Sequence, residues 1–323
     1  MNLDKWKKNY IGLAVIGGSG AYDITLSRIG KLSGTIKIET PFGDSTPVSL
    51  ISVHSVNGMV AFISRHGSGG YRITAPDVNY RANIWALKEL GTTRILSWSG
   101  PGAIDKSLSP GDYVLPEDLI DLTSGRESTF FKGTGLGFIR QNPVFCPQMR
   151  SILADSIKEL AMDFHDGGVY AVTQGPRLET PAEIRMIERL GGNLVGMTLA
   201  PEAFLARELE ICYHPCCYVA NPAEGIKEMP YRAGELFEGM LLKEGEGTGE
   251  KKVRKAVQGF PEIILEAARR IEGAKEAGRD CPCASSMLRY RRAGVIGNDW
   301  RTWIEPAEQR DEPPVIDNKG KYS

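Results

Sequence analysis

Polar residues and glycines follow several short apolar runs of the chain. Gly17–Gly20 (GGSG), Ser64–Gly67 (SRHG) and Ser99–Gly102 (SGPG) follow three of them, and Met197–Thr198 and Asn221–Gly225 (NPAEG) follow two more. These segments supply hydroxyls, one guanidinium, one imidazole and backbone N–H groups beside glycines. All of these groups are hydrogen-bond donors suited to an anion.

The apolar runs themselves have the character of strands, and this decides what the polar segments can do. In open α/β sheets, ligands bind outside the carboxyl ends of the strands. If the five runs lie in one sheet, their polar ends meet and form a pocket for a phosphate or a carboxylate. Taken singly, each segment is weak evidence. The glycines at 17–20 do not match the dinucleotide fingerprint, because Asp23 stands where its third glycine belongs.

Short β-branched runs alternate with helical patterns, which indicates an α/β fold with a largely parallel or mixed sheet. Helices are predicted at 79–90 and 260–271, and a third begins at the capping box Thr180–Glu183 and ends at Gly191. Strands are predicted at 12–16, 59–64, 94–99, 113–122, 169–173, 194–197 and 212–220.

Composition indicates a soluble cytoplasmic protein. The 323 residues are 41% hydrophobic with a formal net charge of -1, which favours neither nucleic acid nor an anionic membrane as partner. No apolar run is long enough to span a bilayer. We predict one domain over residues 1–304 and a polar tail over 305–323. Lys243–Lys252 is glycine-rich and charged, and is predicted to be a surface insertion.

The cysteines suggest a second chemistry. Cys212-x-His214-x-Cys216-Cys217, together with Cys281 and Cys283, contains enough soft ligands for a metal. However, alternate residues of a strand face opposite sides, so we favour buried or incidental cysteines over a structural zinc. Cys281 and Cys283 could instead form a redox-sensitive pair. Six cysteines in so long a chain are not a disulfide framework.

Several ordered motifs in the first two thirds of the chain resemble one enzyme family. They are IGGSG, TPFG, SRHG, NYRANIWALKELG, PGD, QGPRLET and GMTLAPEAFLARE. Over about residues 11–225 the chain resembles the nucleoside phosphorylases of the methylthioadenosine phosphorylase and trimeric purine nucleoside phosphorylase superfamily. The resemblance implies one α/β domain with a central mixed sheet flanked by helices. It also implies assembly as a trimer or a dimer of trimers.

The resemblance also implies roles for individual residues. Asn221 and His66 would be catalytic, with Asn221 donating to the purine N7, and Met197 would lie under the ribose. Phe138 would reach into a neighbouring subunit's 5′ pocket. Inorganic phosphate would be the co-substrate, with no metal or organic cofactor. The implied phosphate ligands are Ser19, Arg65, His66, Ser99, Gly100 and Thr198, with Arg65 binding bidentately, and the implied base pocket is Glu179, Asn221, Pro222 and Ala223.

The base pocket departs from the methylthioadenosine enzymes, which carry aspartates in the base loop where this chain has Asn221 and Ala223. Glu179 replaces a serine of those enzymes. A carboxylate accepts from N1–H of hypoxanthine or guanine, whereas N1 of adenine is itself an acceptor. We therefore expect phosphorolysis of 6-oxopurine nucleosides such as inosine and guanosine.

Other interpretations remain open from the sequence alone. The nearest is a phosphorylase of 5′-methylthioadenosine or methylthioinosine. A nucleoside-binding protein without turnover and a nucleoside hydrolase are two more. The presence of Arg65, His66, Thr198 and Asn221 argues against the first, and the Arg65-His66 motif argues against the second. Glu179 could also serve only the cap region of the helix that follows it.

Overall fold

The computed structural model describes residues 11–54, 56–227, 248–274 and 278–304. No helix within these ranges combines the length and hydropathy needed to cross a membrane. The predicted tail at 305–323 and residues 243–247 of the predicted insertion lie outside the described residues.

An eight-stranded mixed sheet forms the centre of the molecule, in the order β11-β9-β14-β7-β1-β6-β5-β2. The four middle strands β14, β7, β1 and β6 are mutually parallel, and β5 and β2 continue the sheet antiparallel. The strands span Leu13–Gly17 (β1), Lys31–Ile36 (β2), Val48–Ser52 (β5), Met59–Ser64 (β6), Arg94–Ser99 (β7), Tyr113–Leu115 (β9), Phe164–Asp166 (β11) and Cys212–Tyr218 (β14).

A second sheet of five strands has the order β10-β12-β13-β8-β15, and β3 pairs with β4 in a two-stranded ribbon. In the five-stranded sheet only the β13–β8 pair is antiparallel. These strands span Glu39–Thr40 (β3), Gly43–Asp44 (β4), Gly102–Ala103 (β8), Asp118–Asp121 (β10), Val169–Val172 (β12), Leu194–Gly196 (β13) and Asn221–Pro222 (β15).

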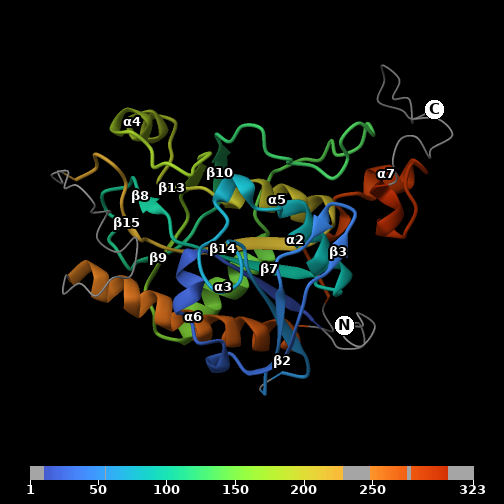
Figure 1. Cartoon of the computed structure of the whole chain (residues 1–323), viewed down its shortest axis with the longest axis horizontal. Coiled ribbons are helices and arrows are strands. Elements are labelled where there is room, and N and C mark those ends of the chain that lie inside the picture. The colour runs from blue at the N-terminus through green and yellow to red at the C-terminus, as the bar shows by residue number, and fades with distance from the viewer. Residues whose placement is uncertain (1–10, 55, 228–247, 275–277, 305–323) are drawn as a thin grey trace.

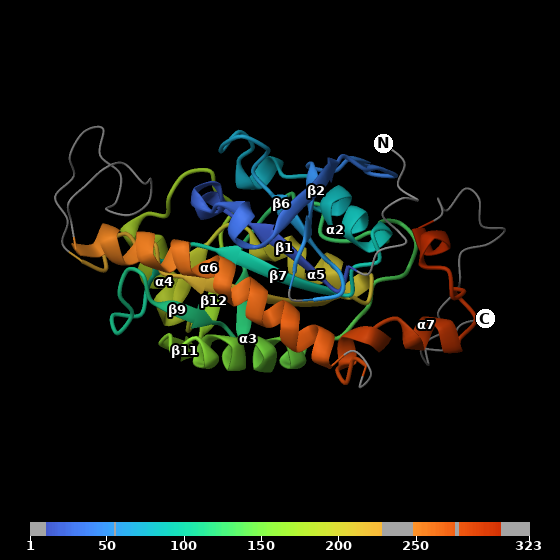
Figure 2. The same cartoon turned by 90° about the horizontal axis from the view of Figure 1, so that it is seen from below.

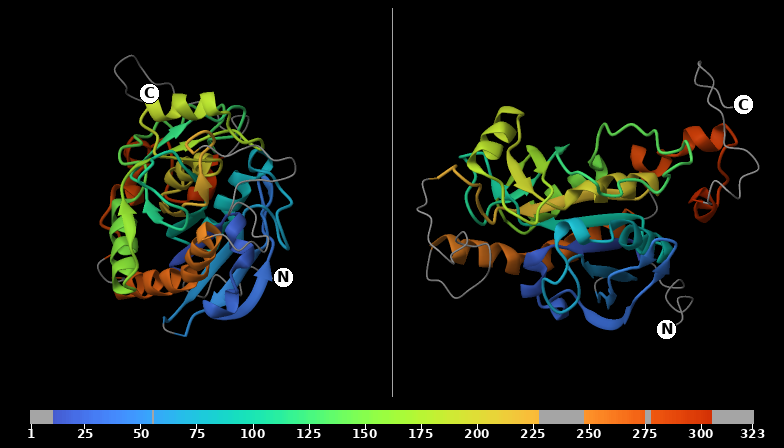
Figure 3. Two further views of the ribbon diagram at one scale, coloured as in Figure 1. Left: turned by 90° about the vertical axis from the view of Figure 1, so that its left-hand side faces the viewer. Right: turned by 45° about the horizontal axis from the view of Figure 1, so that its top comes forward.

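Helices flank the sheets (Figures 1 and 2). α3 and α6 run side by side along one face of the large sheet, and α4 and α7 lie at opposite ends of the molecule (Figure 3). The helices span Tyr80–Glu89 (α2), Pro147–Glu159 (α3), Pro181–Arg189 (α4), Leu199–Glu208 (α5), Thr248–Gly273 (α6) and Leu288–Arg292 (α7).

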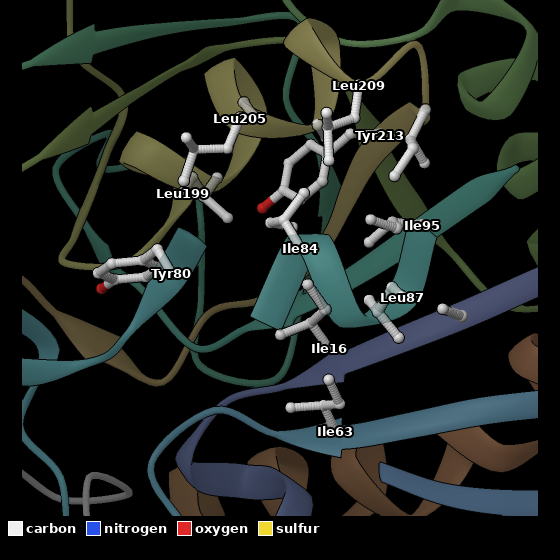
Figure 4. Packing of buried hydrophobic residues seen from close by; sticks show 14 of the residues in the cluster. Ile16, Ile63, Tyr80, Ile84, Leu87, Ile95, Leu199, Leu205, Leu209 and Tyr213 are labelled. Atoms are coloured by element: carbon white, nitrogen blue, oxygen red, sulfur yellow. The ribbon is translucent and has the colours of Figure 1, made fainter. Parts of the chain in front are cut away.

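Alternation along β1 divides the core in two. Ile16 packs in a cluster with residues of α2 and α5, among them Ile84 and Leu205 (Figure 4). Leu13 and Val15 belong to the cluster on the other face, under α3 and α6. Because side chains of a strand alternate between faces, the central strands are apolar throughout and are covered on both sides.

The predicted α/β class and mixed sheet are confirmed, and the β6 and β7 strands have the predicted bounds. The predicted strand at 113–122 is wrong as one element, because it divides into β9 in the large sheet and β10 in the small one. Residues 248–252 of the predicted surface insertion form the start of α6, where Lys251 and Lys252 are exposed.

Candidate active site

The strand register brings the predicted polar segments to one edge of the large sheet. Gly17 at the end of β1 pairs with Ser64 of β6 and with Trp98 of β7, and Cys217 of β14 pairs with Ser99. The chain segments that follow these four parallel strands therefore leave the sheet side by side. The end of β13 and the start of β15 complete the same region from the second sheet.

A cavity of about 290 Å³ opens at this edge. All the predicted site residues except Pro222 and Phe138 line it. Tyr71, Tyr170 and Tyr218 add aromatic walls that the sequence did not indicate. The predicted residues that line the cavity are Ser19, Arg65, His66, Ser99, Gly100, Glu179, Met197, Thr198, Asn221 and Ala223.

Two glycines at the anion end allow close packing of the turns. A Cβ at Gly18 would lie 3.0 Å from both Arg65 Nη1 and the Trp98 carbonyl oxygen, and a Cβ at Gly100 would lie 2.6 Å from the Tyr218 hydroxyl. Any larger residue would therefore have to displace a neighbour. Small residues at these positions keep the turn backbone close to the cavity, where its N–H groups can bind an anion.

Arg65 is only 1% exposed, and most of its hydrogen-bonding capacity is used inside the protein. Nε and Nη2 donate to the two oxygens of Glu202 at 2.7 and 3.1 Å, and Nη2 also donates to Ser97 Oγ at 2.7 Å. Burial alone would lower the pKa of the guanidinium, but the Glu202 carboxylate raises it above its ordinary value.

The expected bidentate contact between Arg65 and phosphate is therefore a contact with Glu202. Nη1 donates one hydrogen bond, to the Trp98 carbonyl at 3.1 Å, which leaves one of its two N–H groups for a ligand. The charge of Arg65 is balanced by Glu202. An anion at this end would consequently meet oriented neutral donors and one N–H of Arg65, rather than an unpaired positive charge.

His66 is 5% exposed and held in one orientation. Its Nδ1 lies 2.8 Å from the Ile73 carbonyl oxygen, which assigns the proton to Nδ1, and its ring stacks on Tyr71 at a centroid distance of 4.3 Å. Burial, helped by the charge of Arg65, lowers the pKa of His66 to about 4. The ring is therefore neutral at pH 7, and Nε2 is an acceptor.

The other end of the cavity carries an acceptor and a donor. Glu179 is half-buried, and its Oε1 accepts from the Thr173 hydroxyl. Asn221 is 5% exposed, and its Nδ2 donates to the Pro222 carbonyl at 2.7 Å, which leaves a second N–H and the amide oxygen for a ligand. A carboxylate oxygen and an amide donor thus line one cavity, as a 6-oxopurine requires.

Glu179 makes no hydrogen bond in the N-terminal capping box of α4, which Thr180 and Glu183 form. Thr180 Oγ1 accepts from the Glu183 backbone N–H, and the Glu183 carboxylate accepts from the Thr180 backbone N–H. Arg177 forms an ion pair with the same Glu183 at 2.7 Å. The cap is therefore complete without Glu179, which removes the local structural explanation for that residue.

Arg126 joins two segments of the cavity wall by hydrogen bonds to their backbone carbonyl oxygens. Its Nη1 donates to the carbonyl oxygens of Met197 and Ala200 at 2.6 and 2.8 Å, and its Nη2 donates to that of Gln174 at 2.6 Å. It therefore connects the segment after β13 to the segment that leads to Glu179. No motif pointed to Arg126, because its partners are backbone atoms distant in sequence.

Phe138 and Pro222 lie outside the lining of this cavity. Phe138 is 82% exposed, and its backbone N–H donates to the Tyr290 hydroxyl of α7, at the end of the molecule away from α4 (Figure 3). The predicted reach of Phe138 into a neighbouring subunit stays a prediction. Pro222 accepts the Asn221 amide through its carbonyl oxygen and so orients that side chain.

Known proteins share the sequence pattern of this chain. The sequence profile described as "Phosphorylase superfamily" matches residues 13–246. A Methanothermobacter thermautotrophicus protein named as a probable S-methyl-5′-thioinosine phosphorylase is 43% identical over 234 residues, covering 72% of this chain and 80% of that protein. A Dictyoglomus turgidum protein named as a probable 6-oxopurine nucleoside phosphorylase is 38% identical over 287 residues, covering 88% and 99%.

A solved structure shares the fold. The methylthioadenosine phosphorylase from an antarctic soil metagenomic library superposes with a TM-score of 0.73 at 27% identity, covering 91% of this chain and 97% of that one. The similarity therefore extends over nearly the whole of that protein.

Proposed function

This chain belongs to the phosphorylase superfamily, and we propose on that basis that it cleaves 6-oxopurine nucleosides, such as inosine and guanosine, by phosphorolysis. The observation that carries the proposal is one cavity with anion donors at one end and the Glu179–Asn221 pair at the other. The products are the free base and ribose 1-phosphate.

The residue types suit the charges that develop in this reaction. As the C1′–N9 bond breaks, positive charge builds on the ribose and negative charge on the departing purine. A phosphate dianion held beside C1′ stabilises the first and then forms the new C1′–O bond. The phosphate ligands are Ser19, Arg65, His66, Ser99, the Gly100 backbone and Thr198. Neutral His66 would take part as an acceptor, with its Nε2 accepting from the O–H of the monohydrogen phosphate dianion.

Asn221 serves the leaving group. Its Nδ2 keeps one N–H beyond the bond to the Pro222 carbonyl, and this N–H donates to the purine N7 as negative charge accumulates on the base. Met197 lies under the ribose, in a wall fixed by Arg126. The reaction needs inorganic phosphate as co-substrate and no metal or organic cofactor.

Base selection rests on Glu179. Its carboxylate accepts from N1–H of a 6-oxopurine. N1 of adenine carries no proton, so two acceptors would face each other and no hydrogen bond would form. An unmatched buried acceptor can reduce kcat/KM by a factor of about 10⁴. Ala223 lines the same end of the cavity and brings no charge of its own.

A second candidate substrate is S-methyl-5′-thioinosine, which the relative from Methanothermobacter is named for. It carries the same 6-oxopurine base, so it can form the same hydrogen bonds with Glu179 and Asn221 as inosine. The two candidates differ only at the 5′ group. Leu236 and Phe237 form an apolar pair in the sequence that could accept a methylthio group, and both lie outside the described residues.

We further propose that the enzyme works in the cytoplasm as a homo-oligomer, either a trimer or a dimer of trimers. None of the six cysteines is in a disulfide bond, as is usual in a reducing compartment. Phe138, exposed at the α7 end, is the side chain that would enter a neighbouring subunit's 5′ pocket. Light scattering of the full chain measures the subunit number.

The first experiment measures base release from inosine, guanosine, adenosine, methylthioadenosine and methylthioinosine, each with and without phosphate. Phosphate-dependent release of hypoxanthine or guanine supports the proposal. Preferential release of adenine contradicts the assignment of Glu179, and release without phosphate contradicts phosphorolysis. The ratio of kcat/KM for inosine and methylthioinosine decides the 5′ group.

Glu179→Gln tests the base contact directly. The amide can donate to N1 of adenine, so the ratio of inosine to adenosine kcat/KM should fall by at least about 10-fold. Glu183→Gln is the matched control, because it removes a carboxylate from the same segment but from a residue that does not line the cavity of about 290 Å³. An equal change in both variants would contradict a direct role for Glu179.

A further inference from the structure

Four cysteines converge on one point away from the nucleoside cavity. Cys146, Cys212, Cys281 and Cys283 place their sulfur atoms within 4.8 Å of one another. Cys146 is the N-cap residue of α3 and Cys212 begins β14. Cys281 is the N-cap residue of a short 3-10 helix at Pro282–Ser285, and Cys283 lies within that helix. Three separate parts of the chain thus supply one set of thiols.

The spacing of the sulfur atoms fits a shared metal ion. Cys212 Sγ and Cys281 Sγ are 3.3 Å apart, and all four cysteines are free. A tetrahedral zinc ion with Zn–S bonds of about 2.3 Å holds its sulfur atoms about 3.8 Å apart. A disulfide bond requires about 2.05 Å between two sulfur atoms, and none of the four cysteines is in a disulfide bond.

The surroundings are closed, as in structural metal sites. Cys146 and Cys212 are 0% exposed and Cys283 is 2% exposed, and only Cys281 is half-buried. All four belong to or border the apolar cluster beneath α3 and α6. Four protein ligands and no open coordination position are typical of a zinc ion that stabilises a fold rather than one that acts on substrate.

A buried arginine lies where it can offset the charge of thiolates. Arg94 is 3% exposed and is the register partner of Cys212 on the neighbouring strand β7. Its Nη2 donates to the Gly278 carbonyl, three residues before Cys281. Its Nε is buried and has no hydrogen-bond partner among the described residues. Arg94 therefore places a buried positive charge on the strand next to Cys212.

We propose that Cys146, Cys212, Cys281 and Cys283 bind one zinc ion as four thiolate ligands. The set differs from the one suggested by sequence spacing. His214 is turned to the Pro215 carbonyl through Nδ1, and neither Cys216 nor Cys217 belongs to the group of converging sulfur atoms. Cys146 replaces them because the N-terminus of α3 lies beside β14, where the Cys146 N–H donates to the Tyr213 carbonyl.

The ion would fasten the segment 278–304 to the core. Other contacts also attach that segment. Arg291 forms an ion pair with Glu210 at 2.7 Å, Arg279 donates to the Glu210 carbonyl, and Trp303 lies in the apolar core. It also carries Tyr290, which holds the backbone at Phe138. Zinc bonds to Cys281 and Cys283 would therefore also stabilise the position of the Phe138 backbone.

Metal content of the full chain tests the proposal. The protein is purified with reductant and without chelators, desalted, and analysed for zinc and for reactive thiols in denaturant. We expect about one zinc ion per chain. We also expect Co²⁺ substitution to give the visible bands of a tetrahedral ion and the near-ultraviolet bands of cobalt–thiolate bonds. The cobalt spectrum needs no variant and so does not depend on a mutant folding.

Variants locate the ion. Cys281→Ser changes the least buried ligand and should lose most of the bound zinc and lower Tm. Cys216→Ala is the matched control, since it removes a buried thiol from the same strand as Cys212 but from outside the cluster, and should keep zinc at the wild-type level.

Three results would overturn the proposal. The first is wild-type protein without zinc and with all thiols reduced. The second is protein in which only two of the six cysteines react, because the other four are paired as disulfides. The third is zinc retained in Cys281→Ser. None of these bears on phosphorolysis, which is measured separately by base release.

Discussion

The amino ends and the carboxyl ends of strands β7 and β14 have different surroundings. At the amino ends, Arg94 and Cys212 are sealed in apolar surroundings and joined to the segment 278–304. At the carboxyl ends, Ser99 and Asn221 border an open cavity with hydrogen-bonding groups still available. The same rigid strands thus carry a closed cluster at one edge of the sheet and a reactive pocket at the other.

This difference has a physical origin in the chain direction. Loops leaving the carboxyl ends of parallel strands diverge around a crevice, so they can present polar groups without pairing them internally. The amino ends are reached by segments packed under α3 and α6, where any polar group must find a partner. Variants at each end should therefore affect different measurements.

The largest effect is expected from Glu202→Gln, which breaks the buried pair at the carboxyl ends. Arg65 would keep a buried charge without its counterion, so the free energy of unfolding should fall by about 3–5 kcal/mol. Added phosphate should raise Tm more in this variant than in the wild type, because the anion replaces the lost negative charge. Urea unfolding and thermal shift measure both.

Glu208→Gln is the control on the same helix. Glu208 is also buried, but burial raises the pKa of its carboxyl to about 7, so much of it is already neutral at pH 7. Its replacement should cost far less stability and leave the phosphate-dependent shift unchanged. Equal losses in the two variants would contradict a special role for the Arg65–Glu202 pair.

Asn221→Ala should have the next largest effect, and on rate rather than stability. Loss of one donor to the departing purine should lower kcat by about 10²–10³-fold with little change in the phosphate KM. Zinc content should be unaffected, because the cysteine cluster lies at the other end of β14. A kcat within threefold of wild type would exclude Asn221 from catalysis.

Acid should destabilise the protein through His66. The unfolded chain binds a proton with a pKa near 6.5, and the folded chain only near 4. The unfolded state therefore holds more protons between these values, so this contribution is complete above pH 6.5 and is lost as pH falls toward 4. It amounts to roughly 3 kcal/mol. His66→Asn should show a shallower loss of stability over that window, and an unchanged slope would contradict a buried neutral His66.

The smallest effect is expected from Thr180→Ala, which removes the N-cap of α4. The free energy of unfolding should fall by about 1 kcal/mol. The ratio of inosine to adenosine kcat/KM should stay as in the wild type, although Thr180 is adjacent to Glu179. A change in this ratio would show that the cap orients the base-reading carboxylate.

Local patterns in the sequence predicted the elements with strong signals. The apolar runs at β6 and β7 were predicted with their observed ends, and Asn79 and Thr180 were correctly expected near helix starts. The short strands β8 and β15 were missed, because strands of two residues have no periodicity and exist only through their partners.

By itself, the sequence determined that polar donors follow each central strand, since this depends only on the order of apolar and polar residues along the chain. Tertiary structure decided what those donors do. It paired Arg65 with Glu202, which lies 137 residues away. The two-donor contact that was expected with phosphate is therefore made with Glu202. It also gathered Cys146 with Cys212, Cys281 and Cys283. Both outcomes depend on distances between elements remote in sequence, which residue spacing does not encode.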